Sequence, residues 1–177
     1  MQRQPDDRRL LLACRRGNDA AARDLYALHA PSLLSYARTI DAASAEDAVQ
    51  SAFCTVLTRP VRELRGVRHV RAWLTQIVRN EMLGQLRSHR RSRARERRHL
   101  PVQSAATHEF THDVAEMLTM LPRREREIIV LKHVAELTFE QISLALDVNP
   151  NTASSRYRSG MRRLREMHEQ PRTTHHV

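Results

Sequence analysis

Residues 138–166 read TFEQISLALDVNPNTASSRYRSGMRRLRE, and this stretch decides how the C-terminal part of the chain folds. Thr138 can cap a helix, and Gln141, three residues later, can return the hydrogen bond in a capping box. The apolar residues that follow share one helical face: Phe139, Ile142 and Leu146. The helix is predicted to end at Asp147, because a short polar side chain tolerates the backbone angles of a tight turn.

A second helix is predicted to begin at Pro150, where the N–H that proline lacks would be unpaired in any case. Its apolar stripe comprises Ala153, Tyr157, Met161 and Leu164. Its other faces hold Asn151, Thr152, Ser155, Arg156, Arg158, Arg162, Arg163 and Arg165. This pattern indicates a helix-turn-helix, whose second helix enters the major groove of DNA. This stretch alone leaves open an ordinary solvated helix with an arginine-rich face.

The composition favours a nucleic-acid partner. The formal net charge is +10, and Lys132 is the only lysine among 30 basic residues. Arginine suits phosphate and guanine because its planar guanidinium can form two parallel hydrogen bonds, although a GC-rich genome would produce the same bias. Aromatic residues make up only 4% of the chain, which argues against a stacking platform for single strands.

The same composition bears on the compartment. The two cysteines, Cys14 and Cys54, lie far apart, so we expect reduced thiols and no disulfide framework. No apolar run is long enough for a membrane span, and the N-terminus does not read as a signal peptide. We therefore expect a cytoplasmic protein without membrane insertion.

Helical periodicity also dominates the first half of the chain. Asp6 can cap a first helix that ends at Gly17, and Asn18 can cap a second that continues past Pro31, where it is kinked or restarted. Ser44 is expected to cap a third helix, with Asp47 three residues later in the position of the capping box. A loop at 59–69 and a fourth helix at 70–89 follow.

We therefore predict an all-α protein with two small helical domains, 1–91 and 113–177, joined by a flexible basic and polar linker at 92–112. From Arg87 to His99 the chain holds seven arginines and one glutamate. We interpret this run as a phosphate-binding stripe; the alternative is a solvated helix end.

Both halves resemble an extracytoplasmic-function sigma factor, the smallest class of bacterial RNA polymerase specificity subunits. AEDAVQSAFCTVL, residues 45–57, is similar to the helix that docks on the β′ clamp coiled coil of polymerase. VRAWLTQIVRNEMLGQLR, residues 70–87, resembles the helix that melts and reads the minus-ten element. Residues 120–146 and 151–166 look like sigma region four, which binds the minus-thirty-five element.

The resemblance implies roles for individual residues. Its polymerase-binding set is Asp47, Gln50 and Ser51, where serine replaces the glutamate common in the family. Its minus-ten set is Leu64, Arg65, Asn80, Arg79 and Arg87, with Asn80 lining the pocket of a flipped-out base. Its minus-thirty-five set is Asn151, Thr152, Ser155, Arg156 and Arg158, while Ser154 stands where a basic residue is usual. Trp73 is expected to be a buried core residue.

The implied partners are core RNA polymerase, through its β′ clamp and β flap regions, promoter DNA and an anti-sigma factor. We expect no cofactor, metal or catalysis, because no histidine pair has metal-ligand spacing and no nucleophile has a matching base. The expected function is to direct core polymerase to promoters and support DNA melting. The alternative is an autonomous helix-turn-helix regulator, which would need neither the face of Asp47 and Gln50 nor Asn80.

Overall fold

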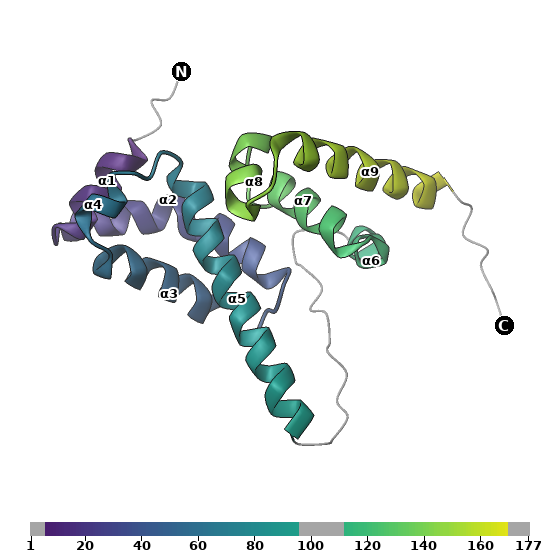
Figure 1. Cartoon of the computed structure of the whole chain (residues 1–177), viewed down its shortest axis with the longest axis horizontal. Coiled ribbons are helices and arrows are strands. Elements are labelled where there is room, and N and C mark those ends of the chain that lie inside the picture. Colours follow the sequence, from purple (N-terminus) through teal and green to yellow (C-terminus); the bar gives the residue numbers. More distant parts are fainter. Residues whose placement is uncertain (1–5, 96–111, 170–177) are drawn as a thin grey trace.

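The computed structural model describes residues 6–95 and 112–169, which are all-α and contain no strand. Their helices are α1 (Asp7–Arg15), α2 (Asp19–Arg38), α3 (Ala45–Thr58), α4 (Val61–Leu64), α5 (Val70–Arg95), α6 (His112–Met120), α7 (Arg123–His133), α8 (Phe139–Leu146) and α9 (Pro150–Glu169). Helices α1–α5 form the first domain and α6–α9 the second (Figure 1). Most of the predicted linker, with the arginines beyond residue 95, lies outside the described residues.

Local sequence signals fix the helix ends that bracket the helix-turn-helix. Thr138 and Gln141 form the predicted capping box, with hydrogen bonds of 3.2 and 2.9 Å. Asp147 ends α8 in the left-handed region at φ 52°, and Pro150 begins α9. In the first domain, the side chain of Asn18 caps α2 by accepting from the backbone N–H of Ala21 at 2.9 Å.

Three local predictions need correction or completion. The α2 helix runs through Pro31 as one element rather than restarting there. Ser44 precedes α3, but its hydroxyl donates to the Asp41 carboxylate, so no capping box with Asp47 forms. The predicted loop at 59–69 contains the short helix α4, which begins after Pro60 because proline already has the backbone angle of a helix start.

The two domains pack against each other through α5 and α8, with α5 lying between the two helix groups (Figure 1). One continuous cluster of buried side chains includes Leu74, Val78 and Met82 from α5 and Ile142 and Ala145 from α8. Each large aliphatic side chain buried in this way stabilises the fold by roughly 1.5–3 kcal/mol. The helix pairing therefore brings the predicted minus-ten helix against the helix-turn-helix.

A second, smaller cluster holds α6, α7 and α9 together through Leu118, Leu121 and Ile129. At Gly160 the α9 backbone packs directly against the side chain of Ile129 on α7, because a Cβ atom there would lie only 2.8 Å from Cδ1 of Ile129. The contact fixes the direction of α9, which carries the predicted recognition residues.

Candidate functional surfaces

The outer face of α3 is exposed and polar at its N-terminal end. Ala48, Val49, Ala52 and Val56 are buried and hold the helix to the first domain. Asp47 and Gln50 are exposed on the opposite side, and neither forms an ion pair or side-chain hydrogen bond with the described residues. Ser51, the third predicted polymerase contact, is half-buried. Further along α3, Leu57 is 51% exposed, so the face becomes apolar toward its C-terminal end.

The loop before α5 borders a cavity of about 400 Å³. Its lining comprises Glu63, Gly66, Val67, Arg68, His69, Ala72, Trp73, Gln76, Glu140 and Leu144. We predicted that Trp73 is buried in the core. It is instead half-buried and lines this cavity. The opening is shaped by the first domain, but α8 of the second domain supplies part of the wall.

Two predicted minus-ten residues occupy other positions than expected. Leu64 is fully buried in the core of the first domain, so its side chain cannot contact DNA and instead anchors the loop. Asn80 is exposed on α5 but does not line the cavity, whereas Gln76, one helical turn earlier, does. The sequence offered a signal for Gln76, because it lies three residues after Trp73 on the same helical face. Arg65 is exposed in the loop.

Arg79 is held by the second domain. Its Nε donates to Oε1 of Glu127 at 2.6 Å, and Nη2 lies 3.5 Å from Oε2. Burial works against the charge of Arg79, but the hydrogen bond and charge of Glu127 outweigh burial, and the pKa of Arg79 is raised. The same carboxylate lies beside Tyr36, whose pKa is raised chiefly by burial. Arg87 is exposed and donates to the carbonyl of Leu83 at 3.1 Å.

The recognition residues of α9 divide into exposed and covered groups. Asn151, Ser155 and Arg158 are exposed, and Thr152 and Ser154 are half-buried. Arg156, which we had placed on the outer face, is half-buried and borders a second cavity of about 270 Å³. That cavity is lined by Arg79, Arg124, Glu127, Leu146, Val148 and Arg156. One predicted minus-ten contact and one predicted minus-thirty-five contact therefore meet at the boundary between the domains.

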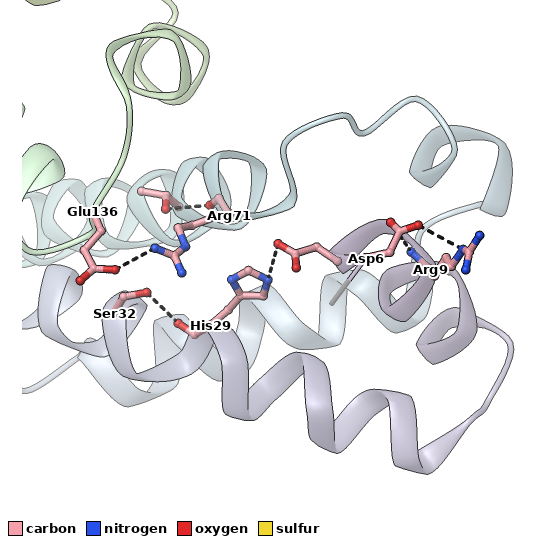
Figure 2. A network of polar contacts seen from close by, with 8 residues as sticks. Asp6, Arg9, His29, Ser32, Arg71 and Glu136 are labelled. Carbon is pink, nitrogen blue, oxygen red and sulfur yellow. Dashed lines mark hydrogen bonds and ion pairs between the residues drawn. The ribbon is translucent and has the colours of Figure 1, made fainter. Parts of the chain in front are cut away.

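Two further ion pairs cross this boundary. Nη1 of Arg71 lies 3.1 Å from Oε2 of Glu136, and Nε2 of His69 lies 3.8 Å from Oε1 of Glu140. Figure 2 shows Arg71 and Glu136 pointing toward one another, near the ring of the fully buried His29. The second domain therefore engages Arg71 and Arg79 of α5 and His69 just before it, while Arg87 further along α5 stays exposed.

Comparison with known proteins assigns both halves of the chain. The family Sigma-70 region 2 matches residues 25–92, and the family Sigma-70, region 4 matches residues 111–164. The RNA polymerase sigma factor CarQ of Myxococcus xanthus is 31% identical over 161 residues, covering 86% of this chain and 92% of CarQ. This chain belongs to the sigma-70 family of RNA polymerase sigma factors.

The region content, two and four in that order, is that of the extracytoplasmic-function class. The sigma factor is thus a transcription initiation factor that directs core polymerase to promoters, and it is not an enzyme. The alternative of an autonomous helix-turn-helix regulator is replaced by this assignment, because region 2 covers the first domain.

Two solved structures share the fold. CnrH, in complex with the cytosolic domain of CnrY, is 24% identical, with a TM-score of 0.65 over 91% of this chain and 96% of CnrH. RpoE of Bartonella quintana, in complex with the anti-sigma factor NepR, is 23% identical, with a TM-score of 0.67 over 85% of this chain and 98% of RpoE. None of the described helices has the length and apolar character of a membrane span, and no group of metal-ligating side chains is found among those residues.

Proposed function

We propose that the three surfaces of this sigma factor have separate tasks in promoter recognition. The outer face of α3, with Asp47, Gln50 and the adjoining Ser51, docks on the β′ clamp of core polymerase. The supporting observation is that Asp47 and Gln50 are exposed and unpaired among the described residues, although the helix beneath them is fully packed. A polar pair that the fold does not use is available for a partner.

The loop before α5 and the basic side of that helix take the nontemplate strand of the minus-ten element. The cavity beside Trp73 and Gln76 is open enough for a base that leaves the stack, and the amide of Gln76 can read the edge of that base. Asn80, one turn further, then contacts the neighbouring nucleotide, while Arg65, Arg79 and Arg87 hold phosphates.

The N-terminal half of α9 enters the major groove at the minus-thirty-five element. Asn151, Thr152, Ser155, Arg156 and Arg158 supply its polar contacts, and the β flap of polymerase holds the second domain in place. The fold shared with the sigma factor RpoE, which was solved in complex with the anti-sigma factor NepR, supports an anti-sigma partner here. The protein acts in the cytoplasm, where polymerase and promoters are found.

Transcription from a randomised promoter library with purified core polymerase tests the minus-ten assignment. Gln76→Ala should relax the preference at one position of the minus-ten element, because a good base contact contributes roughly 1–3 kcal/mol of discrimination. Asn80→Ala should alter the preference at a different position of the minus-ten element. Arg162→Ala, which changes an exposed residue of α9, should alter the preference at neither position. If Gln76→Ala left every position of the selected promoters unchanged, the cavity would not be the base pocket.

A further inference from the structure

The ion pairs between the two domains share one arrangement of charge, with the basic residue in the first domain and the acidic residue in the second. Among the described residues there are three of them, and each joins a basic side chain of the first domain to a glutamate of the second. The partners are Arg79 with Glu127, Arg71 with Glu136, and His69 with Glu140. Three glutamates from three different segments therefore converge on one side of α5 and the loop before it.

The tightest of these pairs uses a DNA-contact residue. Glu127 holds the guanidinium of Arg79 through both carboxylate oxygens, at 2.6 and 3.5 Å. A phosphate would use the same planar set of donors, so the carboxylate stands where a DNA phosphate would bind. The pair is mostly enclosed, with 22% of Arg79 and 17% of Glu127 exposed. A DNA phosphate can bind the Nε and Nη2 donors of Arg79 only after Glu127 has moved away from them.

The second domain also supplies part of the wall of the cavity that would receive a base. Glu140 and Leu144 of α8 form one wall of the cavity that Trp73 and Gln76 line from α5. The adjacent segment carries Glu136 in the left-handed region at φ 54°, which is uncommon for a residue with a Cβ atom. The Glu136 carboxylate accepts a hydrogen bond from Nη1 of Arg71 at 3.1 Å. The segment between α7 and α8 is thus shaped to meet α5.

From this placement we infer that α8 and the minus-ten strand are alternative occupants of the same side of α5. The glutamates at 127, 136 and 140 act as phosphate substitutes that, together with the apolar packing of α5 against α8, hold the free sigma factor closed. The inference rests on the proposed function, because it takes α5 as the minus-ten surface. Two of the three pairs include a glutamate that is more than 70% exposed, so the closed state is reversible and weakened by salt. The apparent DNA affinity of the free chain is reduced by the small fraction that is open.

The test compares two full-length double variants, each of which loses two negative charges from the second domain. Glu127→Gln with Glu136→Gln removes two of the pairs, whereas Glu116→Gln with Glu166→Gln removes two exposed glutamates that make no contact with the first domain. Small-angle X-ray scattering measures the radius of gyration, and fluorescence anisotropy measures binding of a labelled random-sequence single strand. We expect the first variant to expand and to bind the strand roughly three- to tenfold more tightly than the second.

A second pair of variants guards against misfolding, since Glu127 is mostly enclosed. Glu136→Arg with Glu140→Arg changes two exposed side chains, repels Arg71 and removes the carboxylate beside His69, and Glu116→Arg with Glu166→Arg is its matched control. If the Glu127→Gln, Glu136→Gln variant loses helicity in circular dichroism, the inference is judged on the Glu→Arg variants alone. An unchanged radius of gyration would overturn the inference, as would expansion without tighter binding than the control.

The proposed function is tested in parallel by promoter-dependent transcription with the parent chain and core polymerase. Failure of the parent in that assay would refute the assigned roles in promoter recognition, whereas the scattering measurement reports closure without any DNA. The two failures are therefore distinguishable.

Discussion

The first domain presents two helices in opposite states. On α3, Asp47 and Gln50 are exposed and have no partner among the described residues. On α5, Arg71 and Arg79 are both engaged by glutamates of the second domain. The difference indicates an order of events, because the surface proposed for polymerase is accessible in the same chain whose surface proposed for DNA is covered. Docking on polymerase can precede the separation of the domains.

The sign of the charge explains why the second domain covers one helix and not the other. The segments that face the first domain carry Glu127, Glu136 and Glu140, which are attracted to the basic side of α5. The first turn of α3 is itself acidic, with Glu46 and Asp47, and it would repel them. The same acidic turn suits a basic surface on polymerase.

The largest effect is expected from reversing the charge on the accessible helix. Asp47→Arg should abolish binding to core polymerase, because like charges that face each other across an interface cost several kcal/mol. It should lower the free energy of unfolding by less than about 1 kcal/mol, since Asp47 is exposed and contributes mainly to the helix dipole. A pull-down with core polymerase and a melting curve on the same preparation measure both quantities.

Asp19→Arg is the matched control for that variant. Asp19 is also exposed and also lies in the first turn of a helix of the first domain, so the helix-dipole effect is the same while α3 is unchanged. The control should bind polymerase as the parent does. A folded Asp47→Arg variant that still bound polymerase normally would remove α3 from the docking surface and, with it, the proposed order of events.

A smaller effect is expected on the covered side of the molecule. Arg156→Ala should weaken promoter binding by the holoenzyme by roughly 1–3 kcal/mol and relax the preference at one or two positions of the minus-thirty-five element. Polymerase binding should not change, because Arg156 lies at the boundary between the domains and not on α3. Weaker binding with the same sequence preference would make Arg156 a phosphate contact rather than a base reader. Arg162→Ala, on the exposed side of α9, is the control.

Local signals made much of the fold predictable. The capping box at Thr138, the left-handed turn at Asp147 and the helix start at Pro150 depend on residues within a few positions of each other, so the sequence alone contains them. The region 2 and region 4 resemblance was likewise confirmed. The short helix α4 was missed because a proline and a glycine on either side are typical of a loop.

The packing of the domains was not predictable in the same way. The three glutamates that meet α5 lie on α7, on the segment after it and on α8, and each one alone looks like an ordinary surface residue. Periodicity identifies which face of a helix is buried, but not which distant segment covers a polar one. For this reason we placed Arg156 outside and Leu64 on DNA, whereas the first is partly covered and the second lies in the core.

The smallest expected effect concerns His29, which lies beneath Arg71 on the covered side (Figure 2). Its Nε2 is 3.3 Å from Oδ2 of Asp7. Burial lowers the pKa of His29, the charge of Arg71 acts in the same direction, and the Asp7 carboxylate opposes both without reversing the shift. The folded chain therefore binds a proton at this site less readily than the unfolded chain does.

The sign of the pH dependence follows from that difference in proton binding. Above the usual histidine pKa of about 6.5, neither state carries the proton and the full stability is present. As the pH falls below that value, the unfolded state is protonated first, so the free energy of unfolding decreases, by at most about 1.4 kcal/mol per pH unit for one group. Urea unfolding of the parent, of His29→Gln and of the exposed control His168→Gln between about pH 7.5 and about pH 5.5 measures the slope. The slope should become shallower in His29→Gln and stay unchanged in His168→Gln. Equal slopes in all three chains would mean that His29 is protonated equally in both states, and that the covered side of the first domain is not coupled to pH through this residue.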